Sequence, residues 1–251
     1  APTTGLSTDT MITRALHSTG DFPLILGNAV GRELRRAYEA APSGARRLAR
    51  QTAARDFRAR SAVVLGEGPT LEKVPENGEY TYGSIGEGAE SYSVETFGRI
   101  VGVTRQALVN DDLGAFQRVP AMLGMQARAF QDQQIAQLIE ANPTMADGVA
   151  VFDASHGNLA GTGGAPSEAT LSAARLLMRQ QTGLQGALIN VVPRYMLVPP
   201  ALETDAEKLL SSIQATTTAD VNPFAALELV VEPRLTSSTA WYLVADPAAA
   251  D

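Results

Sequence analysis

The sequence has no cysteine among its 251 residues, and it contains only two histidines and few aromatic side chains. The absence of cysteine excludes disulfides, thiolate metal sites and cysteine nucleophiles. There is no run of about 18 apolar residues, so the sequence predicts no membrane-spanning helix. We also expect no signal peptide, because the first residues lack a basic segment followed by an uninterrupted apolar stretch. With 45% hydrophobic residues, the chain can nevertheless build a sizeable core.

The charge of the chain is negative overall and unevenly distributed. The formal net charge of -7 argues against a protein that binds nucleic acid by neutralising phosphates, which needs a surplus of lysine and arginine. Residues 31–60 hold nine arginines and a net charge of +6, whereas residues 61–96 hold seven glutamates and a net charge of -6. These two blocks could pair within one chain, pair between copies, or remain two solvated faces.

The first hundred residues indicate two projecting segments. Residues 1–55 predict an extended arm with a short helix at 29–41, followed by an Ala/Arg-rich stretch without a clear apolar face. Residues 56–103 alternate apolar and polar side chains on both sides of a Gly/Pro/Glu-rich middle, which predicts a long hairpin with its tip near 72–78. An isolated two-stranded ribbon is marginal in water, so this hairpin is either a lid or an arm on another subunit.

A long helix is predicted for residues 111–141, where apolar side chains recur every three or four residues. Asp111 or Asp112 supplies the acceptor at its start, and Pro120 either opens the helix in its first turn or kinks it. Asn142 and Pro143 are expected to end it.

The remaining sequence predicts alternating helices and strands. A second helix should run from a cap at Ser167 to a stop at Gly183. Residues 187–200 are typical of a buried strand with a proline break, 203–215 of a short helix opened by acidic residues, and 227–235 and 240–246 of two further strands. The pattern as a whole indicates an α+β fold.

Few residues could carry chemistry. Asp153, Ser155 and His156 share one short loop, where a catalytic triad can seldom align, so we expect a turn that the Asp and Ser side chains stabilise. A small hydrolase using these three residues is the alternative from another class. No spacing indicates a metal site, and no cofactor is expected.

Two further features have ordinary explanations. The segment GNLAGTGG (157–164) lacks the GK[ST] of a phosphate loop and is interpreted as a flexible connection, although a binding module using this loop is a further alternative. Trp241 and Tyr242 lie in an alternating apolar strand and predict core packing.

Taken in order, the arm, the acidic hairpin and the segment FGRIVGVTRQALVNDDLGAFQRVPAMLGMQARAFQDQQIAQLIE resemble the major capsid proteins of tailed phages with the Hong Kong 97 fold. The segments NVVPRYMLVPPALETDAEKLL, NPFAALELVVEPRL and AWYLVADP continue the resemblance. It is closest to the branch in which the capsid protein is fused to or follows a prohead protease. Its most specific parts are RQALVNDDLGAF (105–116) and VPPALETDAEKLL (198–210).

The resemblance implies a domain organisation. Residues 1–55 would be the N-terminal arm, 56–103 the E-loop hairpin, 104–198 a peripheral domain with spine helix 111–141, and 199–251 the axial domain. Family members continue past WYLVADPAAAD through strands that return to the peripheral domain. The resemblance therefore implies a C-terminally truncated chain with an incomplete axial domain.

The resemblance also implies a function. The protein would be no enzyme but a structural head protein that self-assembles into hexamers and pentamers of an icosahedral phage or prophage shell. Its partners would be further copies of itself, the prohead protease and the portal during assembly, and packaged DNA held without specific binding, with no membrane. It would lie in the virion, and in the host cytoplasm during assembly. An encapsulin-like cellular compartment is the nearest alternative.

Contacts between subunits are expected from the two charge blocks. We predict that the arginine-rich arm lies against the glutamate-rich hairpin of an adjacent subunit. The candidate residues are Arg46, Arg47, Arg50, Glu72, Lys73, Glu76 and Glu79. Some members of the resembling family cross-link a hairpin lysine to an asparagine of another subunit, and Lys73 is the candidate lysine here.

Overall fold

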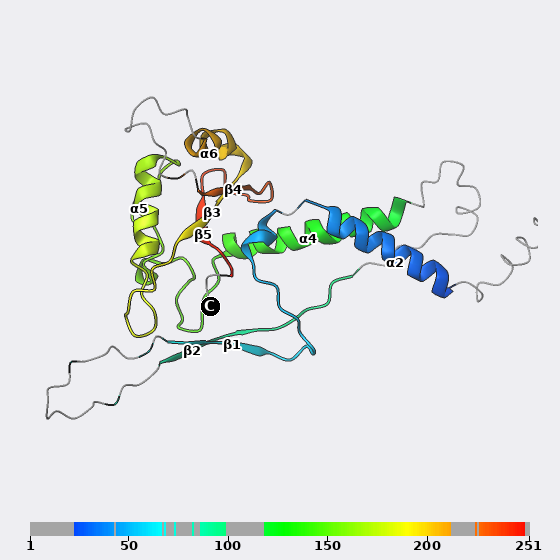
Figure 1. Cartoon of the computed structure of the whole chain (residues 1–251), viewed down its shortest axis with the longest axis horizontal. Coiled ribbons are helices and arrows are strands. Elements are labelled where there is room, and N and C mark those ends of the chain that lie inside the picture. The colour runs from blue at the N-terminus through cyan, green and yellow to red at the C-terminus, as the bar shows by residue number, and fades with distance from the viewer. Residues whose placement is uncertain are drawn as a thin grey trace, which may run out of the picture. The chain divides into compact units, whose positions relative to one another are not determined.

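The computed structural model describes residues 23–42, 44–66, 68, 73, 82, 86–98, 118–211, 224 and 226–248, and for residues 23–30 and 65 the backbone alone. Its elements are shown in Figure 1 and are, in chain order, α2 (Pro23–Ala40), η1 (Ala45–Leu48), β1 (Arg60–Leu65), β2 (Glu87–Tyr92), α4 (Val119–Ala141), η3 (Ala154–His156), α5 (Glu168–Arg179), β3 (Pro193–Val198), η4 (Pro200–Leu202), α6 (Glu203–Leu210), β4 (Glu228–Val231) and β5 (Tyr242–Ala245). The chain forms two compact units. The first comprises Ala1–Pro42 and Ile100–Phe130, and the second comprises Ser43–Arg99 and Gln131–Asp251.

In the first unit, helix α2 packs closely against the first half of α4. A Cβ added at Gly124 would overlap the Leu34 carbonyl oxygen and would lie 3.0 Å from the Tyr38 nitrogen. The two helix backbones therefore meet where α4 has no side chain. The Arg128 guanidinium lies 5.5 Å from the centre of the Tyr38 ring, a cation–π distance. This part of the predicted extended arm therefore packs within the first unit.

Helix α2 also begins six residues earlier than the predicted Ala29. Proline is tolerated in the first helical turn because its missing N–H would have no partner there, and α2 begins at Pro23.

Helix α4 confirms one of the two interpretations of Pro120. The helix begins at Val119, so the proline opens it in the first turn and does not kink it. It ends at Ala141, as predicted, and Asn142 adopts the left-handed conformation with φ 45. Asp111 and Asp112, the predicted helix start, lie outside the described residues.

The second unit is built on a three-stranded sheet in the order β4-β3-β5. Strand β3 pairs in parallel with β4 and antiparallel with β5. Successive side chains of a strand point to opposite faces, and β3 is buried on both. Met196 and Val198 join Leu171 of α5 and Ala206 of α6 in one cluster. Leu197 joins Ala136 of α4 in a second cluster on the other face. Helices thus cover both faces of a mixed sheet.

The predicted elements of the second unit are present, with two corrections. Ser167 caps α5 as expected, and its reciprocal bonds with Thr170 form a capping box. However, α5 ends at Arg179, so Gly183 is not its stop. Gly183 instead donates its N–H to the Ala187 carbonyl at 2.9 Å in a short turn. Strand β3 begins at Pro193, and residues 187–192 precede it without being part of the strand.

The predicted hairpin is present as a two-stranded antiparallel ribbon of β1 and β2, hereafter the ribbon. Its register pairs Arg60 with Tyr92, Ala62 with Glu90 and Val64 with Gly88. It extends beyond the strands, because the Gly66 N–H donates to the Gly86 carbonyl at 2.7 Å. Of the predicted tip, only Lys73 is among the described residues.

Candidate assembly surface

The predicted contact residues of the arm bond largely to their own chain. Arg47 donates to Glu228 Oε1 at 2.9 Å, and its guanidinium lies 5.9 Å from the centre of the Tyr195 ring. The Arg46 side chain donates to Gln51 Oε1. Arg50 is exposed and also has an interaction within the chain. The structure therefore does not test whether these arginines contact another subunit.

The glutamates predicted as their partners cannot be placed. Glu72, Glu76 and Glu79 lie outside the described residues. Lys73 is exposed, as its expected position at a hairpin tip requires. The pairing of arm and hairpin thus stays a prediction.

Two buried carboxylates hold the segment that follows α2, a feature that the sequence did not reveal. Asp132 of α4 accepts the Arg46 backbone N–H at 2.8 Å. Glu232, which follows β4, accepts the Ala45 N–H at 3.3 Å. Ala45 and Glu232 are both fully buried. We call this set of contacts the arm clamp, because it fixes residues 44–46 to the body of the second unit.

The arm clamp depends on close approach at Gly44 and on charge balance at Glu232. A Cβ at Gly44 would lie 2.7 Å from Glu232 Oε2 and 3.4 Å from Asp132 Oδ2, so a side chain there would displace the carboxylates. The Arg234 guanidinium donates to Glu232 Oε1 at 2.7 Å, and the Arg234 N–H donates to the same oxygen at 3.1 Å. Buried carboxylates are tolerated when they are paired and hydrogen-bonded in this way.

The ribbon and the residues beside it expose large apolar side chains. Val63 is 58% exposed, and Phe57 and Phe97, which flank the strands, are 68% and 60% exposed. Large apolar side chains gathered on a surface are typical of a protein–protein contact. Among the described residues the ribbon has two strands only, so neither outer edge pairs with another described strand.

The opposite face of the ribbon contacts its own body. Gly88 and Glu90 are the partly buried positions of β2, and they lie on the same face because they are two residues apart. The two carboxylate oxygens of Glu90 accept the Ala146 N–H at 3.0 and 3.2 Å. Leu184 lies over the glycines: a Cβ at Gly88 would be 3.3 Å from Leu184 Cδ1, and one at Gly66 would be 3.4 Å from Leu184 Cβ.

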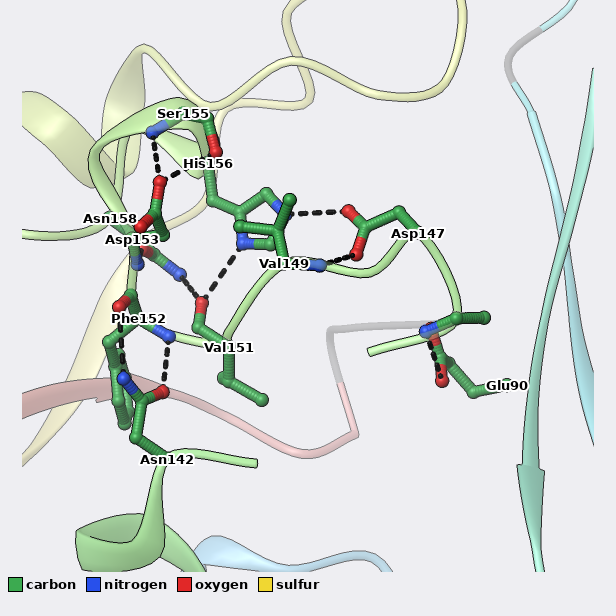
Figure 2. Close-up of polar contacts among 11 residues, drawn as sticks. Glu90, Asn142, Asp147, Val149, Val151, Phe152, Asp153, Ser155, His156 and Asn158 are labelled. Atoms are coloured by element: carbon green, nitrogen blue, oxygen red, sulfur yellow. Dashed lines mark hydrogen bonds and ion pairs between the residues drawn. The ribbon is translucent and has the colours of Figure 1, made fainter. Parts of the chain in front are cut away.

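The loop with Asp153, Ser155 and His156 is a stabilised turn, as expected. Figure 2 shows that Asp153 Oδ1 accepts both the Ser155 N–H at 2.8 Å and the Ser155 hydroxyl at 2.7 Å. His156 faces away from this pair. Ser155 thus bonds to Asp153 and not to a histidine base, so the geometry is not that of a catalytic triad. The hydrolase alternative therefore loses its support.

The partner of His156 is Asp147, which lies outside the Asp153–Ser155–His156 triplet. His156 Nε2 lies 2.8 Å from Asp147 Oδ2, and Nδ1 lies 3.1 Å from the Val151 carbonyl oxygen. The hydrogen bond that His156 donates to the Asp147 carboxylate is the largest cause that raises the pKa of His156. The Val149 N–H and then His156 lower the pKa of Asp147.

Two more polar side chains hold loops at the end of α4. Asn142 donates to the Phe152 carbonyl at 3.0 Å and accepts the Phe152 N–H at 2.7 Å, which closes the loop between them (Figure 2). Glu140 accepts the N–H groups of Thr236 at 2.7 Å and Ser237 at 2.9 Å. The bond from Ser237 is the largest of those that lower the pKa of Glu140. These bonds lie outside the segment GNLAGTGG (157–164), whose interpretation as a flexible connection stays a prediction.

The described residues give no sign of a metal or membrane site. Among them, no group of three or more His, Asp or Glu side chains could hold a metal ion. No described helix is both long and apolar enough to cross a bilayer. Trp241 packs against the first core cluster, as predicted, and its Nε1–H donates to the Gly164 carbonyl at 2.8 Å.

Comparisons with known proteins identify the class of this fold. A family model described as phage capsid protein matches residues 88–251. The chain therefore belongs to the phage capsid protein family and is a structural protein rather than an enzyme. A search of curated proteins finds no match.

Solved structures of phage heads share the fold. The structure titled "Bacteriophage JBD30 capsid" aligns with a TM-score of 0.64 at 16% identity and covers 92% of this chain and 100% of that chain. The procapsid of the same bacteriophage gives a TM-score of 0.61 at 16% identity, covering 87% and 100%. The capsid decorated with minor capsid protein trimers gives 0.59 at 17%, covering 78% and 92%.

Proposed function

We propose that this chain is the major capsid protein of a tailed phage or prophage, and that it assembles as hexamers and pentamers into an icosahedral shell with the Hong Kong 97 architecture. In this proposal residues 1–55 are the N-terminal arm, 56–103 the E-loop, 104–198 the peripheral domain and 199–251 part of the axial domain. The shell encloses DNA. The prohead protease and the portal are partners during assembly, in the host cytoplasm.

The observation that carries the proposal is the two-sided character of the ribbon. One face contacts its own subunit through the Glu90 hydrogen bonds and the approach of Leu184 to Gly66 and Gly88, while the other face presents Val63 to solvent. A ribbon of two strands is too small to be stable without such support, and its exposed apolar side chains call for a cover. A neighbouring copy supplies that cover repeatedly when subunits are related by symmetry.

The phage head is favoured over a cellular compartment by the family match. The solved structures with the same fold are titled as phage capsids and a procapsid. A net negative chain also suits a container whose packaged DNA must not adhere to the wall.

Assembly of the full-length protein with its protease, followed by electron microscopy, tests the proposal. We expect closed shells from the wild-type chain. Val63→Asp should prevent shell formation, because it places a charge on the proposed contact face, while the subunit remains folded because Val63 is already exposed. Val63→Thr, of nearly the same shape, is the matched control and should assemble. Normal shells from Val63→Asp would refute a contact at this face.

Charge exchange tests the predicted pairing of arm and hairpin. Arg46→Glu together with Arg50→Glu should impair assembly, and Arg47 is left unchanged because it already pairs with Glu228. Reversing the hairpin glutamates Glu72, Glu76 and Glu79 to lysine in the same chain should restore it. If the combined variant assembles no better than the arginine variant, the two segments do not pair.

A further inference from the structure

The contacts between the ribbon and its own body form one connected chain of bonds that ends at a histidine. Glu90 of β2 accepts the N–H of Ala146. Ala146 is followed in the same turn by Asp147, whose Oδ1 accepts the Val149 N–H at 2.9 Å and whose Oδ2 faces His156 at 2.8 Å. Figure 2 shows this series, with Glu90 reaching from the strand toward the turn.

The arrangement around His156 is complete in one protonation state only. Both ring nitrogens face oxygen acceptors, the Val151 carbonyl and the Asp147 carboxylate. A neutral imidazole carries one N–H and can donate to one of them, whereas the imidazolium donates to both. Backbone bonds, such as that from the Met145 N–H to the Val149 carbonyl at 2.8 Å, hold the turn in both states, and the turn loses one side-chain bond when the His156 proton leaves.

We propose that His156 and Asp147 form a protonation-controlled latch, which aims the Ala146 N–H at Glu90 and so fixes the ribbon against the body of its subunit. Leu184, which packs against Gly66 and Gly88, is the second contact between the ribbon and the body, and it does not titrate. Loss of the His156 proton therefore weakens the Glu90–Ala146 contact and leaves the Leu184 contact unchanged. The ribbon then swings about the Leu184 contact.

The charges around His156 favour its protonated form, in which the latch is closed. Asp147 in the turn and Asp153 at the cap of η3 both interact electrostatically with His156, and Asp147 raises its pKa most strongly. A histidine whose pKa is raised by folding contributes stability below its unfolded pKa of about 6.5 and loses that contribution as pH rises through the folded pKa. The lowered pKa of Asp147 adds stability above its unfolded value of about 3.9, which is lost as pH falls. The latch should therefore hold best in mildly acidic solution.

The latch is a property of the single subunit and does not depend on the proposed shell. Its consequence for assembly does rest on the proposed function, since the angle of the ribbon decides which part of a neighbour it meets. The test therefore uses unassembled full-length subunits, so that a failed latch and a failed shell are separate results.

The absence of cysteine allows two spin labels to be placed without background labelling. Ser91→Cys on the ribbon and Ser172→Cys on α5 are suitable positions, because both serines are exposed and lie in the second unit. Pulsed electron spin resonance then gives the distribution of distances between the ribbon and the body. In the wild-type background we expect a narrow distribution at about pH 5.5 and a broad one at about pH 8.5, on either side of the ordinary histidine pKa.

Substitutions separate the latch from general loosening. Glu90→Ala should lose the narrow distribution at both pH values. Glu87→Ala is the matched control: it removes a glutamate from the opposite, exposed face of the same strand and should behave as wild type. His156→Phe, which keeps a flat ring without N–H donors, should be broad at both pH values.

Asp147→Asn should reverse the pH dependence. If its Oδ1 stays bonded to the Val149 N–H, its amide nitrogen faces His156 Nε2 and can donate only to a neutral ring. The narrow distribution should then occur at the higher pH. Equal distance distributions for Glu90→Ala and Glu87→Ala would overturn the latch. Its control by His156 would be overturned by a wild-type distribution of the same width at both pH values. The same would follow if the distribution of Asp147→Asn were narrow at the lower pH, as in the wild type.

Discussion

Replacing Glu232 by alanine tests whether the arm clamp stabilises the second unit. The substitution removes the acceptor of the buried Ala45 N–H at 3.3 Å and both bonds from Arg234, at 2.7 and 3.1 Å. The matched control is Glu228→Ala. Glu228 is the same residue type four positions earlier, and its ion pair with Arg47 has a similar distance of 2.9 Å but lies at the surface.

The expected magnitudes differ because of burial. An orphaned buried N–H costs about 1–3 kcal/mol, and a lost hydrogen bond to a charged group about 1.5–3 kcal/mol. Breaking a buried ion pair by removing one partner costs about 3–5 kcal/mol. Since Arg234 stays partly exposed and can be rehydrated, we expect Glu232→Ala to lower the free energy of unfolding by about 3 kcal/mol, at the lower end of that range. Both side chains of the Arg47–Glu228 pair are about 40% exposed, so Glu228→Ala should cost at most about 1 kcal/mol.

Urea unfolding of unassembled subunits, followed by tryptophan fluorescence, measures both values. Trp241 is the one tryptophan in the sequence and packs in the core of the second unit, so its emission reports the unfolding of that unit. Glu232→Gln, which keeps one acceptor oxygen, should fall between the two alanine variants. Equal losses for Glu232→Ala and Glu228→Ala would show that the buried contacts add nothing beyond a surface pair, and would refute the clamp.

Two further predictions concern α4. Gly124→Ala should destabilise the packing of α2 by about 1–3 kcal/mol, because the new methyl group has no room against Leu34. Gly31→Ala, with nothing within 4 Å of the new methyl group, should instead stabilise α2 by about 0.5–1 kcal/mol. Amide exchange of α2, measured by mass spectrometry, distinguishes the two variants, and equal effects would contradict the close helix contact. Glu140→Ala should lower the protection of the Thr236 and Ser237 amides against hydrogen exchange. In the wild type this protection, taken relative to the intrinsic exchange rate at each pH, should fall as pH falls through the lowered pKa of Glu140, and unchanged protection in the variant would count against its role.

Local signals in the sequence predicted several elements because neighbouring residues determine them. Ser167 and Thr170 close a capping box within one turn, and Glu203 opens α6 at the positive end of a helix dipole. The apolar run that became β3 is buried on both faces of the sheet, which a continuous apolar pattern indicates. Each of these signals lies within a few residues of the structure that it specifies.

The contacts that fix the arm and the ribbon could not be predicted in this way. Ala45 and Glu232 are 187 positions apart, and Arg46 and Asp132 are 86 apart, so nothing near either residue indicates its partner. Gly124 could have been noticed as a glycine inside a strong helical pattern, which often marks close packing. Asp147 and His156 lie nine positions apart, whereas Asp153 is only three positions from His156, so spacing in the sequence favoured the acid that does not bond to the histidine.

The distribution of polar and apolar contacts explains how one subunit can be both well defined and ready to associate. Buried carboxylates with several hydrogen bonds fix the orientation of the segment that they hold, but they add little net stability, because their desolvation offsets much of the gain. They fix residues 44–46, and the partly buried carboxylate of Glu90 does the same for the ribbon. Apolar side chains give affinity without fixing an angle, and Val63 on the ribbon and Phe57 and Phe97 beside it are left exposed. A protein that must bind identical neighbours at fixed angles needs both the polar contacts that orient the ribbon and the exposed apolar side chains. A ribbon without a fixed orientation would lose conformational entropy at every contact, which would weaken the association.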